Sequence, residues 1–125
     1  MNIDAFQYLD ILRPIALALP GMTEGTSFGT PAFHVNKKFV ARMKEDGITL
    51  VIRTWEREKW IRAKPAVYYF TDHYLNYPGM LVRLSKVSQK DLEALFLAAW
   101  KKLAPKRLLK EREEENAKKE KRRTS

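Results

Sequence analysis

The stretch "AFHVNKKFVARMKEDGITLVIR", residues 32–53, decides the fold, because it reads as three short strands joined by two short turns. The strands are residues 32–35, 38–43 and 48–53, and the last two alternate apolar and polar side chains. The letters VNKK supply one tight turn. Asp46-Gly47 supplies the other and suits the positive φ angles of a type I′ hairpin. Turns this short predict three antiparallel strands.

A helix is expected before these strands. Over residues 3–18, apolar side chains recur three and four positions apart, as they do along one face of a helix. These side chains are Phe6, Leu9, Leu12 and Ala16. Asn2 or Asp4 can cap the helix, and Pro14, which lacks an N–H, predicts a kink or the start of a second helix.

More elements are expected after the three strands. Residues 55–63 fit a short helix, with Trp55 and Trp60 as apolar anchors and the charged residues facing water. Residues 66–70, "AVYYF", and 80–84, "MLVRL", read as two further strands, with Pro78-Gly79 forming a turn before the second.

The last helix of the domain has a capping pattern and a core face. Ser88 followed three residues later by Asp91 is typical of a helix N-terminus. The helix should run to about residue 103, with an apolar stripe of Leu92, Leu95, Phe96, Ala99 and Leu103. The resulting order, α-β3-α-β2-α, predicts a two-layer α+β fold with a single antiparallel sheet and helices on one face.

The composition excludes several kinds of site. The 125 residues, 45% of them hydrophobic, are enough for one domain with a modest core. With no cysteine and only two histidines, we expect no disulfide, no cysteine nucleophile, no metal site and no cofactor. No apolar run approaches the roughly 18 residues of a membrane span, and the N-terminus is unlike a signal peptide. We therefore expect a cytoplasmic protein with no membrane partner.

The net charge of +9 is unevenly placed. Residues 1–100 contain 13 Lys and Arg against 10 Asp and Glu, a net of +3, and residues 101–125 contain 11 against 5, a net of +6. We therefore divide the chain into an α+β domain, residues 1–104, and a basic tail, residues 105–125, which is frayed helix or disordered. The tail's expected phosphate contacts are Lys118, Lys119, Arg122 and Arg123.

Strict alternation predicts that one face of the sheet is rich in arginine. The inward side chains should be Phe39, Ala41 and Met43 in one strand and Ile48, Leu50 and Ile52 in the next. The outward side chains should be Val40, Arg42, Lys44, Thr49, Val51 and Arg53, joined by Arg83 from a third strand. Because these strands place no carboxylate outward, the face is either simply solvated or a contact for an anionic partner, and Arg42, Lys44, Arg53 and Arg83 are the candidates.

The stretch "YYFTDHYLNYPGMLVRL", residues 68–84, holds four of the five tyrosines and one of the two histidines. It is open to three interpretations, as a reactive site, a ligand pocket or one end of the core. We favour a core with a polar rim. In that interpretation His73 is a hydrogen-bonded structural histidine, and the tyrosines bury their rings and keep their hydroxyls in water.

The sequence contains one match to a known catalytic motif. Residues 25–29, "GTSFG", fit the Gly-x-Ser-x-Gly pattern with Ser27 in the place of the nucleophile. That motif needs a strand before it and a helix after it, whereas here "LPG" ends a helix before it and a strand follows. We therefore expect a chance match in a turn, and no catalytic residue in the chain.

Three segments of the chain together resemble the MmcQ/YjbR-like family. They are "LALPGMTEGTSFGTPAFHV", "KKFVARMKEDGITLVIR" and "TDHYLNYPGMLVRL", and the helix "DLEALFLAAWKKLA" completes a resemblance over about residues 5–104. The matching motif residues are Gly29, Pro31 and Phe33 in one motif and His73, Tyr74, Tyr77, Pro78 and Arg83 in the other. The resemblance implies a two-layer α+β fold similar to type III secretion chaperones. It also implies DNA binding, through an arrangement described as a double wing.

These observations lead to one expected function and two alternatives. We expect a non-enzymatic protein that binds DNA or another polyanion weakly and without sequence selectivity, through the arginine face and the tail. The first alternative is a protein-interaction module, which the chaperone-like fold suggests. The second is a small-ligand pocket under residues 73–79. Fold alone does not decide among them.

Overall fold

The computed structural model describes the backbone of residues 3–124 and the side chains of residues 7–119. Within that part of the chain, six strands form one antiparallel sheet in the order β1-β2-β3-β4-β6-β5. The strands are β1 (Met22–Ser27), β2 (Thr30–Val35), β3 (Lys38–Met43), β4 (Thr49–Arg53), β5 (Tyr68–Tyr69) and β6 (Gly79–Arg83).

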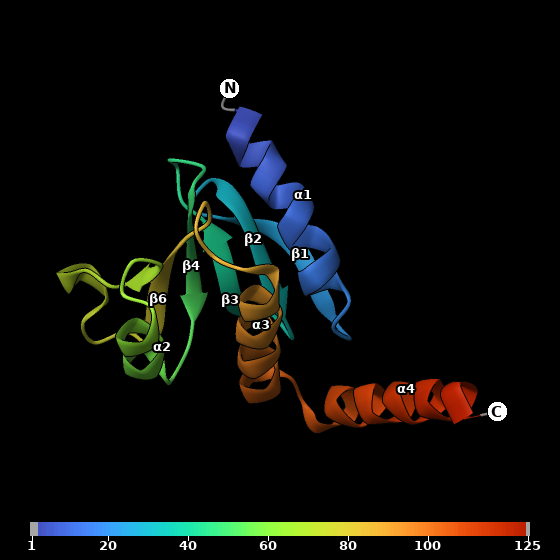
Figure 1. Ribbon diagram of the computed structural model, residues 1–125. Coiled ribbons are helices and arrows are strands. Elements are labelled where there is room, and N and C mark those ends of the chain that lie inside the picture. The colour runs from blue at the N-terminus through green and yellow to red at the C-terminus, as the bar shows by residue number, and fades with distance from the viewer. Residues whose placement is uncertain (1–2, 125) are drawn as a thin grey trace.

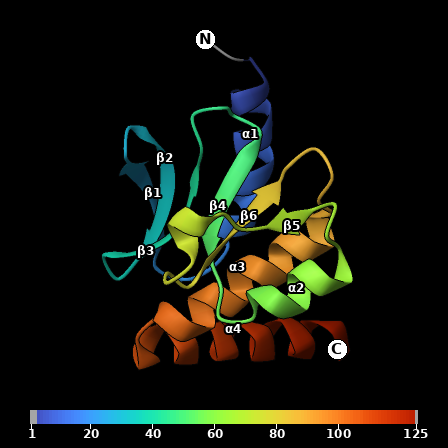
Figure 2. The same ribbon diagram turned by 90° about the vertical axis from the view of Figure 1, so that its left-hand side faces the viewer.

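The helices of the domain lie on one side of this sheet. They are α1 (Ile3–Leu17), α2 (Arg57–Ala63) and α3 (Gln89–Leu103). A further helix, α4 (Lys106–Thr124), follows α3, and a 3-10 turn, η1 (Asp72–Tyr74), precedes β6. In Figure 1, α1 and α3 lie in front of the sheet. In Figure 2, which is turned by 90°, strands β1 to β3 are seen apart from α2 and α3. The predicted two-layer α+β fold is therefore confirmed. None of the described helices is both long and apolar enough to cross a bilayer.

The core lies between α1, α3 and the inner face of the sheet. Leu9, Leu12 and Ala16 of α1 are buried, as their spacing predicts, and α1 continues through Pro14 as one helix. The predicted stripe of α3 is buried too, and Phe96 meets Phe33 of β2 edge to face, with 5.8 Å between ring centroids. The predictions for Asn2, Asp4 and Phe6 concern side chains outside the described part of the chain. Such packing gives the helices their fixed place on the sheet.

The N-terminus of α3 combines a cap with a charged network. The Oγ of Ser88 accepts a hydrogen bond from the Asp91 N–H at 3.1 Å, so the predicted cap is confirmed. The Asp91 carboxylate in turn accepts from Lys64 Nζ at 2.8 Å and from the buried Tyr68 hydroxyl at 2.7 Å. The Lys64 bond, then the Tyr68 bond, hold the pKa of Asp91 below its usual value. Burial beside that carboxylate raises the pKa of Tyr68.

We predict that Asp91→Asn lowers the free energy of unfolding by about 1–2 kcal/mol at neutral pH, because the charge-assisted bonds weaken. Since the folded-state pKa of Asp91 is depressed, its contribution is present above the unfolded-state pKa and is lost as the pH falls through the folded value. Denaturant titrations at pH 7 and pH 3 should therefore show a difference in unfolding free energy between wild type and variant that is smaller at pH 3. The exposed Glu93→Gln is the matched control, and a gap of equal size at both pH values would contradict the prediction.

Strand β1 is an element that the sequence prediction missed. It forms one edge of the sheet and pairs with β2 through Ser27 and Thr30, leaving a loop of only Phe28 and Gly29. Their φ angles of 53° and 78° are both positive, as a type I′ turn requires. The "MTEGTS" letters of β1 are mostly exposed, so no apolar alternation marks the strand.

A β-bulge reverses part of the predicted alternation. The register between β2 and β3 passes from Phe33–Ala41 to His34–Phe39, which leaves Val40 as an extra residue. Val40 and Ala41 are therefore both in the core, and Phe39 lies on the opposite face. The prediction that Phe39 points inward and Val40 outward was wrong, because strict alternation holds only in a strand without a bulge.

The connection between β3 and β4 also differs from the prediction. Gly47 has a positive φ of 71° but Asp46 does not, so Asp46-Gly47 is not a type I′ hairpin turn. The Asp46 carboxylate instead accepts hydrogen bonds from the N–H groups of Ile48 and Thr49, each at 2.9 Å. Burial opposes ionisation of Asp46, yet these bonds and the one from the Thr49 hydroxyl lower its pKa. By contrast, "VNKK" does form a tight turn, with positive φ at Asn36 and Lys37.

Helix α4 begins after a break at Ala104 and Pro105 and is helical through Thr124, one of the two states expected of the tail. Its first turn belongs to the core, because the Leu108 side chain is only 7% exposed and packs beside Gly21. After Lys110 the described side chains are almost all exposed, and Figure 1 shows the helix extending away from the body of the domain.

Candidate functional site

The face of the sheet opposite the core, here called the outer face, carries the three predicted arginines. Residues paired across antiparallel strands point to the same side, and the pairings run from Arg42 to Val51, then to Leu81 and Tyr69. Arg53 lies two residues beyond Val51, and Arg83 two residues beyond Leu81. Alternation therefore places Arg42, Arg53 and Arg83 on this one face, each from a different strand.

The outer face is not a simple solvated surface. Val51 is 2% exposed, and Ala32 and Leu81 are also buried although they lie outside the main core cluster. Residues 70–78, which connect β5 to β6, account for this, because Tyr74 and Tyr77 line the same hollow as Val51. The outer face therefore carries a small apolar floor beneath aromatic and cationic side chains.

That hollow, here called the outer groove, has a volume of about 640 Å³. Its lining comes from the β1–β2 turn, β3, β4 and the segment before β6, and consists of Ser27, Phe28, Phe39, Arg42, Glu45, Val51, His73, Tyr74 and Tyr77. Segments far apart in sequence meet here, and five of the nine side chains are aromatic rings, counting His73. An aromatic hollow beside cations can take a planar, negatively charged partner.

Arg42 is held by its own surroundings. Its side chain is 12% exposed, and Nη1 donates to the Thr30 hydroxyl at 3.3 Å, to the Met43 carbonyl at 3.3 Å and to the Glu45 carboxylate at 3.4 Å. The guanidinium also lies 5.2 Å from the centroid of the Phe28 ring. Arg42 therefore organises the groove, and its charge is partly balanced by Glu45.

Arg53 and Arg83 differ from Arg42 because neither pairs with a carboxylate in the described part of the chain. Arg53 lies between two rings, 5.1 Å from the Trp55 centroid and 5.8 Å from the Tyr77 centroid. Among the described side chains, the Nε of Arg53 is buried and has no hydrogen-bond partner. The terminal nitrogens of Arg53 are not in that state, so they reach water. Arg83 stacks 4.0 Å from the Tyr69 centroid and donates once, to the Ala66 carbonyl. Both cations are held in place and keep their charge unbalanced.

Arg57 fixes the segment that covers the outer face. It begins α2 and stacks 3.9 Å from the centroid of the Phe70 ring. Its two terminal nitrogens donate to four backbone carbonyls at 2.7–3.1 Å, those of Tyr74, Leu75, Tyr77 and Gly79. The sequence prediction placed the charges of this helix in water, and for Arg57 that was wrong.

Residues 68–84 divide between the core and the outer groove. Tyr68 belongs to the core, as expected of part of the stretch. His73 is exposed and its ring makes no hydrogen bond to any described residue, so the prediction of a hydrogen-bonded structural histidine was wrong. It packs edge to face on Tyr74, with 4.9 Å between ring centroids. Partial burial raises the pKa of Tyr77, and the positive charge of the nearby Arg53 acts in the opposite direction.

Phe28 is the most unusual side chain of the groove. It is 84% exposed, although a large apolar side chain gains about 2 kcal/mol from burial. It also occupies a positive φ of 53°, which costs a residue with a Cβ about 1 kcal/mol. Neither packing nor the turn explains a phenylalanine here, so an exposed aromatic in a strained position points to a contact with something else.

The remaining predicted site residues lie in different places. Lys44 follows β3 and is half-buried near Glu45 and Asp46, whose pKa values it helps to lower. Lys118 and Lys119 are exposed on the projecting part of α4, away from the outer groove, and the side chains of Arg122 and Arg123 lie outside the described residues.

The family-motif residues divide into structural and groove positions. Phe33 is in the core, Gly29 takes the second positive φ of the β1–β2 turn, and Pro31 pairs with Thr26. The Pro78 carbonyl accepts from the Thr54 N–H at 3.1 Å. Of the other four, His73, Tyr74 and Tyr77 line the outer groove, and Arg83 stacks on Tyr69.

Ser27 gains no catalytic support from its surroundings. It ends β1, and its carbonyl accepts from the Thr30 hydroxyl at 3.0 Å. Within the described residues, no histidine is hydrogen-bonded to its hydroxyl, as a serine nucleophile requires. The strand–turn–strand context also differs from the strand–turn–helix of the Gly-x-Ser-x-Gly motif.

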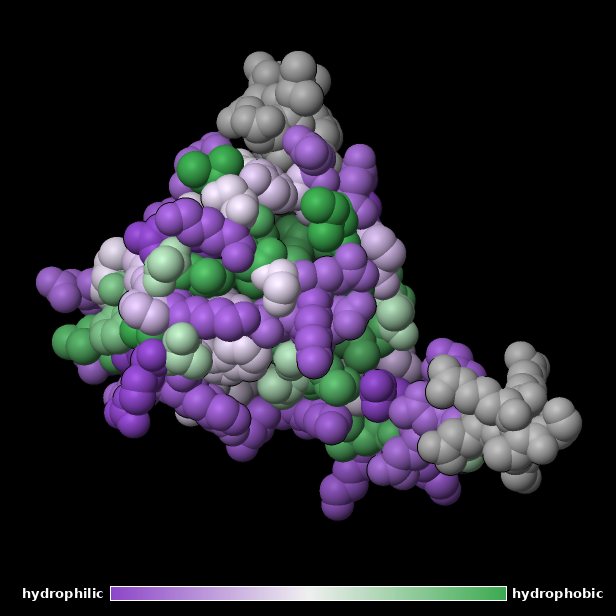
Figure 3. Space-filling view, in the orientation of Figure 1, coloured by the Kyte–Doolittle hydropathy of each residue, from purple (hydrophilic) through white to green (hydrophobic). Residues whose placement is uncertain are grey.

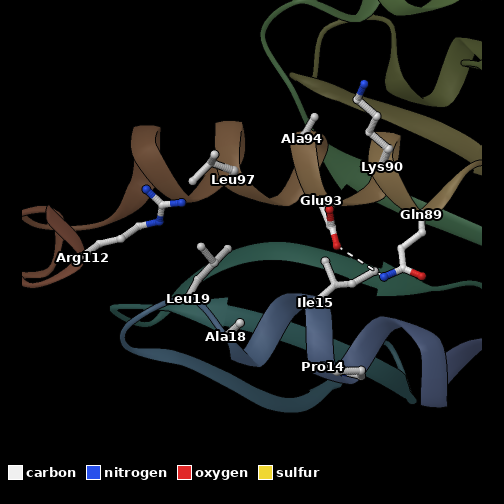
Figure 4. A pocket seen from close by; sticks show the side chains of 10 residues that line it. All are labelled: Pro14, Ile15, Ala18, Leu19, Gln89, Lys90, Glu93, Ala94, Leu97 and Arg112. Atoms are coloured by element: carbon white, nitrogen blue, oxygen red, sulfur yellow. Dashed lines mark hydrogen bonds between the residues drawn. The ribbon is translucent and has the colours of Figure 1, made fainter. Parts of the chain in front are cut away.

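A second hollow lies on the helix side of the domain. This helix groove has a volume of about 560 Å³ and runs between α1 and α3, with Arg112 of α4 at one end (Figure 4). Ile15, Leu19 and Leu97 form its apolar part, and Lys90 and Glu93 its polar rim. Figure 3, which views this side, shows apolar surface between polar side chains.

Comparison with known proteins supports the fold. The structure is similar to that of the Deinococcus radiodurans protein DR2400, which is described as a DUF419 domain. The TM-score is 0.62, the sequences are 21% identical, and the match covers 74% of this chain and 75% of that one. The fold resembles that of a DUF419 domain. DUF419 is the MmcQ/YjbR-like family, so the two-layer α+β fold that the sequence resemblance implied is confirmed.

Sequence comparison adds relatives but no activity. Uncharacterised proteins of Mycobacterium bovis and Mycobacterium tuberculosis are 35% identical over 68 residues, which is 54% of this chain and 46% of each relative. The chain thus spans about half the length of the curated relatives it matches. No family model matches the sequence.

Proposed function

We propose that this protein is a non-enzymatic nucleic-acid-binding protein that contacts phosphates through the outer face of its sheet. The observation that carries the proposal is the pair Arg53 and Arg83. Both cations are fixed against aromatic rings, and neither is balanced by a carboxylate among the described residues. Positioned guanidinium groups with unbalanced charge attract phosphate oxygens.

The charged tail would add contacts without selectivity. Two of its described basic residues, Lys118 and Lys119, are exposed on a helix that extends from the domain. The tail also contains five glutamates, which offset part of the attraction. We therefore expect a dissociation constant on the order of micromolar or weaker at physiological salt.

The test is a titration of labelled oligonucleotides at about 50 mM and about 200 mM salt with the full chain. The double variant Arg53→Gln/Arg83→Gln should reduce the slope of log affinity against log salt by about 1.5, because two phosphate contacts are lost. Arg42 is left intact, because its bonds to Thr30 and Met43 hold the groove together.

The matched control removes the same charge from another surface. Lys86 and Lys90 are exposed, and their side chains make no hydrogen bond or ion pair with the described residues. Lys86→Gln/Lys90→Gln should leave the affinity and the slope nearly unchanged. An equal loss in both double variants would show general charge attraction and would overturn the assignment to the outer face.

A protein-interaction module is the second candidate, and the helix groove is the observation that favours it. An apolar strip of Ile15, Leu19 and Leu97 with a charged rim can receive an apolar side chain from a partner. This candidate gains weight if the oligonucleotide titrations show no binding even at low salt.

A further inference from the structure

We infer that the outer groove binds unpaired bases by stacking, so that the nucleic acid this protein prefers is single-stranded. The inference rests on the proposed function and goes beyond phosphate contact. It names the ligand class of the groove itself, a single-stranded segment with its bases turned toward the protein. Three features of the described residues lead to it.

The first feature is the arrangement of rings around the groove. Phe28 and Phe39 come from the side of β1 to β3, and His73, Tyr74 and Tyr77 come from the segment before β6, while Val51 from the strand between them contributes to the lining. Phosphates need no aromatic rings. Bases do, because stacking on an aromatic side chain provides binding that tolerates any base.

The second feature is the state of the Phe28 ring. It is 84% exposed, and its principal described contact is the Arg42 guanidinium at 5.2 Å. The type I′ turn fixes its backbone, so the ring is displayed on a rigid element and loses little freedom on binding. A flat ring already ordered by an arginine is a ready platform for a base.

The third feature is the distribution of charge. Arg42 lies beside Phe28, Arg53 lies beside Tyr77, which lines the groove, and Arg83 lies on the same face on the strand next to that of Arg53. Glu45 is the one carboxylate among the nine lining residues, and it is bonded to Arg42. A backbone of phosphates can thus pass over the arginines while a base enters the groove.

Duplex DNA fits this surface less well. Its bases are stacked on one another and offer only their edges, so a protruding phenylalanine ring gains nothing without unstacking a base pair. The single strand has no such cost. We therefore expect the groove to distinguish the two forms although their phosphates are alike.

The experiment compares three ligands of about 12 units, an intact single strand, its duplex and an abasic strand with the same phosphates. Wild-type protein should bind the intact strand about 10-fold more tightly than the abasic strand, and more tightly than the duplex. Phe28→Ala should weaken binding of the intact strand about 10-fold and leave abasic binding unchanged. Phe28→Trp should preserve the preference. Because Phe28 is exposed, the alanine variant should melt close to the wild-type temperature, which checks that the fold is intact.

Each other outcome overturns a defined part of the account. Equal binding of intact and abasic strands, an unaffected Phe28→Ala, or tighter binding of the duplex would overturn base stacking and leave phosphate binding standing. Loss of abasic binding in Phe28→Ala would likewise contradict a role for the ring in stacking. Absence of binding to all three ligands at low salt would overturn the proposed function together with the inference.

Discussion

Arg57→Ala should lower the free energy of unfolding by about 3 kcal/mol, although it removes a residue that is not in the core. The substitution removes four hydrogen bonds to backbone carbonyls, although those of Tyr74 and Tyr77 each keep a backbone N–H donor, and it removes the stacking on Phe70. The segment from Phe70 to Gly79 then loses its fixed course over the outer face. Denaturant unfolding measures the loss, and limited proteolysis within that segment should become faster.

Two variants make the Arg57 result specific. Arg57→Lys keeps the charge but replaces a planar fork by a single nitrogen, so it should recover only part of the stability. Arg62→Ala removes an exposed arginine from the same helix and should change the stability by less than about 0.5 kcal/mol. If Arg57→Ala is as stable as Arg62→Ala, the four carbonyl bonds are not what holds the segment.

Gly21→Ala should also destabilise the fold, by about 2–3 kcal/mol, and the effect should depend on Leu108. Gly21 has a positive φ of 75°, and a Cβ there would lie 2.5 Å from Leu108 Cδ1. Leu108→Ala alone should cost about 2 kcal/mol through the buried volume it removes. In the double variant the clash disappears. The loss of stability measured for the double variant should therefore be about 1 kcal/mol smaller than the sum of the losses in the two single variants.

The same contact predicts two different truncations. A chain ending at Lys110 keeps Leu108 and should be as stable as the full chain within about 0.5 kcal/mol. A chain ending at Pro105 loses Leu108 and half-buried Leu109 and should be about 2 kcal/mol less stable. Equal stability of the two truncated chains, or additive losses in the Gly21 and Leu108 double variant, would show that α4 does not dock on the domain.

Local sequence patterns predicted most of the fold. The α3 cap at Ser88, the buried stripe of α1, the tight turn at Asn36 and the order of the inner strands all follow from rules that act over a few residues. The shared face of Arg42, Arg53 and Arg83 followed from alternation, and it is correct because the bulge at Val40 precedes Arg42.

The missed features depend on distant parts of the chain. Arg57 bonds to carbonyls 17 to 22 residues away, which no local pattern contains. Strand β1 has little apolar alternation because it is an exposed edge, and Trp55, predicted as an apolar anchor, is instead an exposed partner of Arg53. Gly29 was the only local hint of this hairpin, because a type I′ turn favours glycine at its second position but not phenylalanine at its first.

The most direct test of the central claim is to add a short single-stranded oligonucleotide to ¹⁵N-labelled protein and record which backbone amides shift. Binding at the outer groove predicts the largest changes at Phe28, Gly29, Val51 and Tyr77, with smaller changes near Arg83 and in the tail. Changes confined to α1 and α3, around the helix groove, or to the tail alone would contradict the claim that the outer face is the binding surface.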